Sequence, residues 1–347
     1  MQTVRSAAVG KSAGKPAGKP AGDLTGKPKR RRVNGVLFID KPAGITSNGV
    51  LGALKRLYNA DKAGHTGTLD PFATGLLPVA LGEATKFSGH LIDADKTYLA
   101  TMQLGVTTAT GDPEGAVLEV RPVEVNADQL EAALARFRGV IEQVPPMYSA
   151  LKRDGKPLYE YARAGVTLER AARQVTIHAL ELIEWRPHRE PQERPESWQP
   201  HAAPLHTVQF RVACSKGTYV RTLAEDIGQA LGCGAHLIAL RREQTGAFTL
   251  ERAVTLAALE AMQANERDAL LQPVDALIEH LPRLDVDAAA AARLRLGQKL
   301  AMHSLGVSAE GFYRVYDSLG AMTGLVQAAR GAIIPERIVA LSSPGGA

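Results

Sequence analysis

Residues 64–75 read Gly64-His65-Thr66-Gly67-Thr68-Leu69-Asp70-Pro71-Phe72-Ala73-Thr74-Gly75. Three glycines, three threonines and a proline surround a single carboxylate, that of Asp70. This composition disfavours a regular helix and makes a poor strand, so we expect Asp70 on a turn-rich loop. Apolar neighbours should hold that loop against a core; they are Leu69, Phe72, Leu76 and Leu77. A carboxylate on such a loop either does chemistry or merely hydrogen-bonds its own turn.

The bulk composition indicates a two-domain protein with buried cores. The chain has 347 residues, 45% of them hydrophobic, and no run approaches the ~18 apolar residues of a membrane span. Its N-terminus lacks the apolar segment of a secretory signal. The two cysteines, Cys214 and Cys233, are too few for a disulfide framework or a four-ligand zinc site. These features predict a cytoplasmic location and no membrane partner.

The net positive charge resides in the N-terminal segment. Residues 1–32 contain nine Lys or Arg and one acid, a net charge of +8; the whole chain carries +5, so residues 33–347 sum to 5 − 8 = −3. Repeated Gly-Lys-Pro triplets and the lack of aromatic residues predict a disordered basic arm that adds salt-sensitive attraction to nucleic acid. A nuclear address at Lys29–Arg32 and an organelle presequence are less favoured readings.

A second unusual segment lies at residues 186–206, which hold five prolines and scattered charges. Its histidines, His188, His201 and His206, could suggest a metal site. Their irregular spacing in a polar stretch favours a solvated insertion instead. No metal site is therefore expected there.

Hydrophobic periodicity predicts a chain of mixed helices and strands. We expect strands at 36–39, 97–104, 175–185, 207–213, 312–316 and 325–328, and helices starting at Thr46 or Ser47, at 127–138, and after Arg221. Gly232-Cys233-Gly234 should end the last of these helices. The β-rich segment from about Pro282 onward is expected to form a domain of its own.

Four clusters concentrate chemically useful residues. They are the Asp70 loop, Asp95–Tyr98, Lys216–Arg221 and Gly232–Arg242. No serine–histidine–acid triad, zinc spacing or nucleotide-binding loop is present in them. They share one carboxylate, two tyrosines on strands and cations near strand ends. Aromatic rings beside cations are typical of a site that stacks a base and neutralises phosphate, although each tyrosine taken singly could be ordinary packing.

Six motifs, in order along the chain, resemble those of the bacterial TruB-type tRNA pseudouridine-55 synthases. They are Asp40-Lys41-Pro42, Gly64–Pro71, Leu81–Lys86, Pro146–Leu151, Ser215–Arg221 and Gly232–His236. The resemblance extends from about residue 33 to 255, and a weaker tail is similar to the family's C-terminal PUA-type RNA-binding domain. Thr68, where some members carry alanine, the arm and the 186–206 insertion depart from the family pattern.

The resemblance implies an α+β fold: a pseudouridine synthase domain, with a mixed, largely antiparallel sheet and flanking helices, followed by a small β-rich PUA-like domain. It implies a catalytic domain at 33–281, which includes the 186–206 insertion, and an RNA-binding domain at 282–347; the disordered arm at 1–32 that composition predicts precedes them. The implied reaction moves the glycosidic bond of uridine-55 in the tRNA T-loop from N1 to C5 of the same base. No cofactor and no metal are implied.

The site residues are carried over position by position. Asp70 matches the family's nucleophile and Arg221 the arginine that pairs with it. Tyr98 matches the tyrosine that stacks on the target base, and Tyr219 a second tyrosine that contacts substrate. His65 and Leu240 match further substrate contacts.

Several points stay open at this level. Asp70 could attack the base at C6 or the ribose at C1′, and Tyr98 or Tyr219 could remove the C5 proton. The partner expected is the T-stem-loop of tRNA, with the enzyme acting as a monomer without an obligatory protein partner. The alternatives are an RNA-binding or folding module without turnover, and a guide-RNA-dependent subunit of a larger particle.

Overall fold

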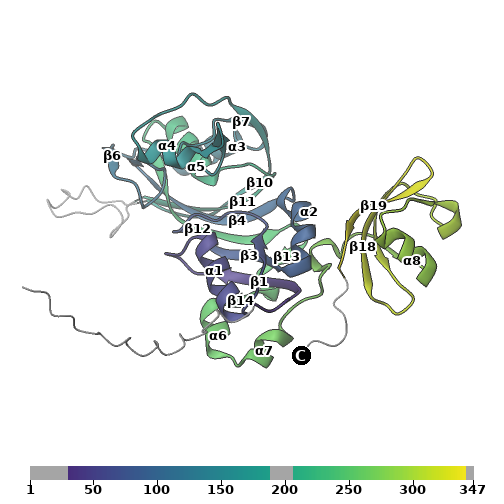
Figure 1. The fold of residues 1–347 in the computed structure, drawn as a ribbon. Helices are drawn as coiled ribbons and strands as arrows, with labels where there is room; N and C mark the ends of the chain where they lie inside the picture. The colour runs from purple at the N-terminus through teal and green to yellow at the C-terminus, as the bar shows by residue number, and fades with distance from the viewer. Residues whose placement is uncertain (1–29, 188–205, 341–347) are drawn as a thin grey trace, which may run out of the picture. The chain divides into compact units, whose positions relative to one another are not determined.

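The computed structural model describes residues 30–187 and 206–340, which are built around a large mixed sheet (Figure 1). Across this sheet the strands follow the order β14 (Val254–Thr255), β1 (Gly35–Lys41), β3 (Thr74–Leu81), β12 (Ala235–Thr245), β4 (Lys96–Leu104), β11 (Thr207–Cys214), β10 (Arg173–Arg186) and β7 (Gly139–Gln143). Two short strands extend it: β2 (Ala63–His65) pairs with β3, and β13 (Phe248–Thr249) with β12. Within the described residues β1–β14 and β3–β12 are parallel pairs and the others antiparallel, which confirms the expected sheet.

Helices and small hairpins surround the sheet. The helices are α1 (Ser47–Leu57), α2 (Ser88–Ile92), α3 (Ala127–Ala135), α4 (Leu158–Arg163), α5 (Val220–Ala230), α6 (Leu256–Ala261), α7 (Ala264–Ala269) and α8 (Ala288–Arg295), with 3₁₀ turns η1 (Gly82–Phe87), η2 (Leu250–Arg252), η3 (Ala276–Ile278) and η4 (His303–Leu305). The hairpins are β5 (Val106–Thr108) with β6 (Val117–Val120) and β8 (Lys152–Arg153) with β9 (Lys156–Pro157). The alternative starts of α1 are resolved, because the Thr46 side chain accepts the Gly49 amide as the N-cap.

The side chains of β1 alternate between the two faces of the sheet, which explains why the half of the sheet that contains β1 is covered on both faces. Leu37 and Ile39 point into a core with α1 and α6, whereas Val36 and Phe38 point into a core with η1 and α2. Strand β4 lies in the other half of the sheet and packs on α3 and α5. These two helices lie on the same side of that half (Figure 1). The Asp70 loop connects β2 with β3, and its Leu69 and Ala73 join the core that contains β4, α3 and α5.

The opening stretch of the sequence is more regular at its ends than predicted. Gly64 and His65 belong to β2, and Thr74 and Gly75 begin β3, so a stretch whose composition disfavours a strand still contributes to a strand at each end. Gly75 makes this possible: its φ is +101°, and a Cβ there would lie 2.3 Å from the Arg242 carbonyl oxygen of β12. Asp70 itself lies on the loop between the two strands, as expected.

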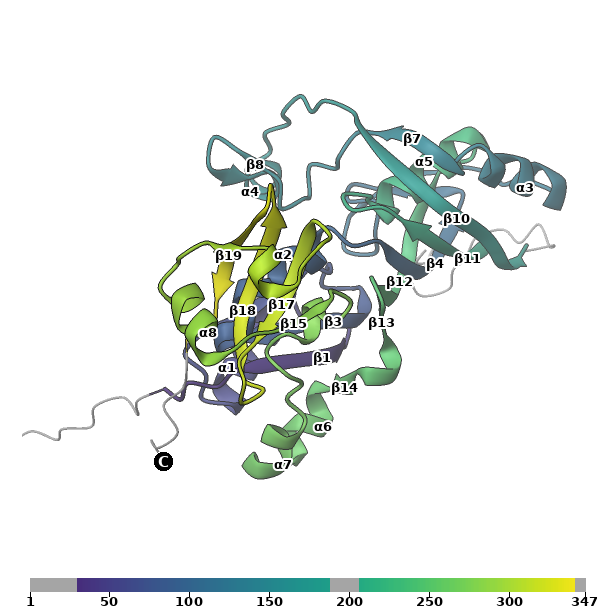
Figure 2. The same ribbon diagram turned by 90° about the vertical axis from the view of Figure 1, so that its right-hand side faces the viewer.

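The C-terminal β-rich segment forms a separate five-stranded sheet (Figure 2). Its order is β15 (Arg283–Asp285), β17 (Gly311–Tyr316), β18 (Met322–Ala329), β19 (Ala332–Ile338) and β16 (Leu300–Ala301). Leu325 and Val339 of this part join the core that contains Phe38 and Phe248. The PUA-like sheet domain expected here is consistent with this arrangement. The boundary at 281/282 stays a prediction.

Two segments singled out in the sequence lie mostly outside the residues that the structure describes. Most of the 1–32 arm and of the 186–206 insertion lies outside the described residues, together with His188 and His201. Arg31, at the end of the expected arm, already forms an ion pair with Asp268 at 2.6 Å. Among the described helices, none is long and apolar enough to cross a membrane.

Candidate active site

Five of the six predicted site residues line one cavity of about 380 Å³. They come from separate elements: Asp70 from the β2–β3 loop, Tyr98 from β4, Tyr219 and Arg221 from the start of α5, and Leu240 from β12. His65 lies on β2 and is not among the residues that line this cavity. Tertiary structure thus unites residues that are up to 170 positions apart in the sequence.

The floor of the cavity holds an ion pair between Asp70 and Arg221. Arg221 Nε lies 3.0 Å from Asp70 Oδ2, and Nη2 lies 3.5 Å from Oδ1, so one edge of the guanidinium faces the carboxylate. The Arg221 side chain is 5% exposed and that of Asp70 is 34% exposed. The arginine is therefore buried while the carboxylate remains open to a ligand in the cavity.

The remaining donors of Arg221 are held by the protein. Nη1 donates to the Thr110 carbonyl at 2.8 Å and to Asp112 Oδ2 at 3.1 Å, and Nη2 donates to the Tyr148 carbonyl at 2.7 Å. The Asp112 side chain is 3% exposed and also receives bonds from the Thr110 hydroxyl and the Glu114 amide. A guanidinium fixed at this many points has little freedom to turn away from Asp70.

Buried polar side chains also fix the loop that carries Asp70. Ser47 Oγ accepts the Leu69 amide at 2.8 Å and donates to the Leu69 carbonyl at 3.1 Å. Lys41 Nζ donates to the carbonyls of Pro42, Ile45 and Pro71 at 2.6–3.1 Å. Asp70 therefore stands between two anchored neighbours, Leu69 and Pro71.

Arg242 holds the other side of the same loop. Its side chain is buried, its Nε donates to the Leu76 carbonyl at 2.7 Å, and its Nη2 donates to the Gly67 carbonyl at 3.1 Å. Its charge also favours the ionised form of Tyr98, against the larger effect of burial, which raises the pKa of that phenol. One cation of β12 thus holds the loop that carries Asp70 at two points and lies within electrostatic reach of Tyr98.

Tyr219 is positioned through its backbone. Its amide donates to Gln143 Oε1 at 2.7 Å, and its carbonyl accepts from Gln143 Nε2 at 3.1 Å. Burial raises the pKa of Tyr219 and that of Tyr98. Both phenols are therefore neutral at pH 7, and a tyrosine acting as a base would first have to pass its proton to a neighbour.

Competing effects set the ionisation of Asp70. Burial raises the pKa of the carboxyl above its ordinary value, the Arg221 guanidinium opposes this, and the charge of Asp112 adds to the increase. Burial also lowers the pKa of Lys41 to about 8. It lowers the pKa of His65 as well, so that His65 is neutral at pH 7. Asp70 is thus a carboxyl group whose pKa lies above that of an exposed aspartate, with Arg221 favouring its charged form.

Comparison with known proteins assigns the family. The chain matches the model of the TruB family pseudouridylate synthase N-terminal domain over residues 55–220, and two TruB C-terminal domain models over residues 221–279 and 282–339. It is 56% identical over 314 residues to the tRNA pseudouridine synthase B of Burkholderia mallei, covering 89% of this chain and 98% of that protein. The chain belongs to the TruB family of pseudouridylate synthases. Membership makes it an isomerase that acts on RNA.

Further relatives agree with this family. A tRNA pseudouridine synthase B from Cupriavidus metallidurans is 54% identical over 317 residues, covering 90% of this chain and 96% of that one. Among solved structures, a chain from a Cbf5–Nop10–Gar1 complex matches with a TM-score of 0.62 and 28% identity over 88% of this chain and 84% of that chain. A chain from an H/ACA RNP bound to substrate RNA has a TM-score of 0.61 and 26% identity, with the same coverage. The pseudouridine synthase fold expected from the sequence is confirmed.

Reasoning from the sequence missed two important side chains of this TruB-family site, Asp112 and Arg242. Asp112 sits in Thr110-Gly111-Asp112-Pro113, which has the same mixture of glycine, proline, threonine and aspartate as the Asp70 loop, so composition could have signalled it. Arg242 belongs to the Gly232–Arg242 cluster identified in the sequence, but no role in the site was assigned to it. Its role depends on β12 lying beside β3, which local sequence does not reveal.

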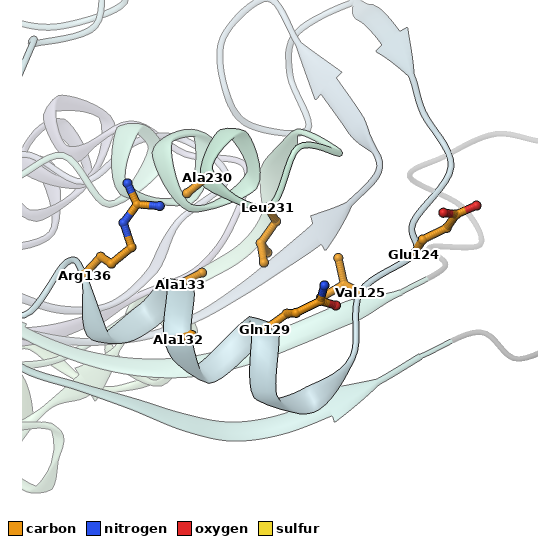
Figure 3. A pocket seen from close by; sticks show the side chains of 8 residues that line it. All are labelled: Glu124, Val125, Gln129, Ala132, Ala133, Arg136, Ala230 and Leu231. Atoms are coloured by element: carbon orange, nitrogen blue, oxygen red, sulfur yellow. The ribbon is translucent and has the colours of Figure 1, made fainter.

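A separate cavity of about 260 Å³ lies between α3 and α5 (Figure 3). Its wall includes Arg136 and Gln129 of α3 and Leu231 at the end of α5, and no predicted site residue. In the part of the chain that the structure describes, no group of three or more His, Cys, Asp or Glu side chains is arranged to hold a metal ion.

Proposed function

We propose that this TruB-family protein isomerises uridine-55 in the T-loop of tRNA to pseudouridine, with Asp70 as the nucleophile. The curated relatives are named tRNA pseudouridine synthases, which supports tRNA as the substrate class. The observation that carries the proposal is the Asp70–Arg221 pair, which opens into a cavity with an aromatic wall. That cavity has the size of a small-molecule site.

The substrate uracil must leave its stack to reach Asp70. Extruding a base from an RNA fold costs a few kcal/mol, which stacking inside the enzyme offsets. Tyr98 and Leu240 line the cavity beside Asp70 and provide an aromatic ring and an apolar side chain for this purpose. We assign His65 to the RNA outside the cavity, because it lies on β2 near the loop but not among the lining residues.

The chemical step uses Asp70 in its ionised form. The carboxylate attacks either C6 of the base or C1′ of the ribose, and the bond between N1 and C1′ breaks with its electron pair left on N1. The uracil turns, C5 bonds to C1′, and the bond to Asp70 breaks and returns the carboxylate. The C5 proton then leaves and N1 takes up a proton. Arg221 keeps the carboxylate charged and aimed while its other donors remain on the protein. Atoms are conserved throughout, so the reaction needs no co-substrate.

The stand-alone mode of action is part of the proposal. We propose a cytoplasmic monomer that acts without a guide RNA, because the tRNA-modifying relatives match at 54–56% identity and the chain of the Cbf5–Nop10–Gar1 complex at 28%. The alternative, an RNA-binding module without turnover, predicts that the protein binds RNA but forms no pseudouridine.

The test is tritium release from a T-stem-loop RNA labelled at C5 of its uridines. Purified protein alone should release one tritium per RNA. A matched RNA with cytidine in place of the target uridine should release none. Binding of the RNA without tritium release would instead support the module without turnover.

A further inference from the structure

The helix that carries Arg221 also carries a second charged side chain close to it. Glu225 follows Arg221 by four residues on α5, and residues at this spacing lie one turn apart on the same side of a helix. The Glu225 side chain is partly buried, and it is not among those that line the catalytic cavity. Any influence of Glu225 on the reaction must therefore pass through Arg221 or the partners of Arg221.

The Glu225 carboxyl group packs on the turn that leads to Asp112. Gly111 of this turn has a φ of +69°, and a Cβ at Gly111 would lie 2.8 Å from both Cδ and Oε1 of Glu225. A larger residue at position 111 would collide with the carboxyl group. The same turn presents the Thr110 carbonyl, which accepts a hydrogen bond from Arg221 Nη1 at 2.8 Å. Glu225 therefore contacts the segment from which the protein holds Arg221.

One guanidinium serves three acidic side chains in this region. Arg221 Nε lies 3.0 Å from Asp70 Oδ2, and Nη1 lies 3.1 Å from Asp112 Oδ2. The charge of Arg221 also acts on Glu225. Among the residues that the structure describes, no cation forms an ion pair with Glu225, and no donor hydrogen-bonds its carboxyl group. The charge of Arg221 alone does not balance three negative charges at a partly buried site, so one of these acids keeps its proton more readily than an exposed carboxyl group does.

Glu225 titrates near neutral pH. Burial raises the pKa of Glu225 to about 7, the charges of Asp226 and Asp112 add to the increase, and the charge of Arg221 opposes it. Asp226 and Arg221 act from the same helix, and Asp112 acts from the loop between β5 and β6. Glu225 is therefore mostly neutral below its pKa and mostly negative above it.

We propose that Glu225 is a positioning residue for the isomerisation, whose neutral form lets Arg221 hold Asp70 in place. The inference rests on the proposed function for the reaction and for Asp70 as the nucleophile. When Glu225 ionises, its negative charge attracts the guanidinium away from Asp70 and repels the carboxylate of Asp112. The turn at Gly111 transmits this repulsion, because the Glu225 carboxyl group lies directly against it. Ionisation of Glu225 slows the chemical step and leaves the binding of RNA unchanged.

The test compares Glu225→Gln with Glu124→Gln. Glutamine has the shape of a protonated glutamate and does not ionise, and Glu124 is an exposed glutamate of the α3–α5 cavity (Figure 3). Single-turnover rates of pseudouridine formation are measured at saturating T-stem-loop RNA from about pH 6 to about pH 8.5, a range that brackets the titration of Glu225. Lys41, whose pKa is lowered by burial to about 8, titrates in the same range in every variant and cancels in a ratio of rates.

The rate of Glu225→Gln divided by that of the wild type should increase with pH. We expect a ratio of about 1 at the lowest pH and about 3 at the highest, which is at the low end of the coupling within one charge network. The ratio for Glu124→Gln should stay at about 1 throughout, as for a surface substitution. The Kd for the RNA should be the same for Glu225→Gln and the wild type at each pH.

A second arm changes the neighbour of Glu225. Asp226→Asn removes one of the charges that raise the pKa of Glu225, so the decline of the rate with increasing pH should have its midpoint at a lower pH than in the wild type. In the double variant Glu225→Gln/Asp226→Asn this shift should be absent, because the titrating group is gone.

The outcomes separate this inference from the proposed function. A ratio for Glu225→Gln that is constant with pH would overturn the inference, because packing alone gives the same factor at every pH. A ratio that decreases with pH would also overturn it, because the ionised form would then be the active one. Both results leave pseudouridine formation by the wild type intact. A wild type that forms no pseudouridine at any pH would refute the proposed function, and this inference with it.

Discussion

Arg221 Nη1 lies 3.1 Å from a carboxylate oxygen of Asp112, on a guanidinium whose Nε lies 3.0 Å from Asp70. One cation thus joins a buried carboxylate to one that is open to the cavity. Asp112 neutralises part of the arginine's charge, and its own charge raises the pKa of Asp70. Asp112, which is not among the residues that line the cavity, therefore acts on the proposed nucleophile through Arg221 and through its own charge.

Asp112→Asn should slow pseudouridine formation without loss of RNA binding. The amide cannot hold Nη1 as a charged acceptor does, so Arg221 loses part of its fixed orientation. We expect the single-turnover rate to fall by about 10- to 100-fold, the usual cost of removing a side chain that orients a reactive group. Glu124→Gln, an exposed change at the α3–α5 cavity, is the control. A variant as fast as wild type would show that Asp112 does not position Arg221.

Arg221→Lys should be severely impaired although the charge is kept. The arginine serves two carboxylates and two carbonyls at once, and an ammonium group cannot reach all four. We expect a loss of about 100-fold in single-turnover rate, comparable with removing a fixed donor from a catalytic site. Affinity for the T-stem-loop should persist. Near wild-type turnover would contradict the need for the planar group.

The pH dependence follows from the raised pKa of Asp70. Because the ionised form reacts, the single-turnover rate falls as pH decreases through that pKa, at a pH above the ~3.9 of a free aspartate. Asp112→Asn removes a negative neighbour, so its acid limb should move to lower pH. Rates measured between pH 4.5 and 8, a range of about 3.5 units that lies above the ordinary carboxyl pKa values, check this. An unmoved limb in Asp112→Asn, with Glu124→Gln as reference, would refute the electrostatic coupling.

Asp70→Asn should leave folding stability at neutral pH equal or higher. The folded pKa of Asp70 is raised, so the unfolded chain loses this proton at lower pH and stability falls as pH rises through the folded value. The amide removes that cost and keeps an oxygen acceptor for Arg221. The melting temperature of Asp70→Asn minus that of the wild type should be larger at pH 7.5 than at pH 4. Asp61→Asn, at an exposed position, should show no such difference.

A melting temperature of Asp70→Asn that is lower than wild type at pH 7.5, by the same amount as at pH 4, would mean that the carboxylate stabilises the fold. The assignment of Asp70 as a group held at an energetic cost for function would then be wrong.

The parts of this fold that depend on short-range pattern could be predicted from the sequence. Leu130 and Leu134 face the core from α3 as their spacing predicted, and Thr46 caps α1. The loop position of Asp70 followed from its glycines and proline. Local sequence does not distinguish two residues that could both fill one structural role. Ser47 was an equal candidate for the N-cap of α1, but it is buried and hydrogen-bonds Leu69 instead.

Long-range contacts account for what the sequence alone could not provide. Leu76 and Leu77 were expected to hold the loop against one core, but they are adjacent on β3 and enter two different cores on opposite faces. The contact between Arg221 and Asp112 spans 109 positions. The residues next to Arg221 in the sequence do not indicate Asp112, and those next to Asp112 do not indicate Arg221. The buried part of the site can therefore be identified only from the order of the strands.

The most direct test of the account measures single-turnover pseudouridine formation at position 55 of an unmodified tRNA transcript, for wild type and Asp70→Asn. No guide RNA or other protein is added, and both proteins are saturated with RNA. We predict complete conversion by the wild type and none by Asp70→Asn at equal RNA occupancy. Conversion by Asp70→Asn at a rate near that of the wild type would contradict the assignment of Asp70 as the nucleophile.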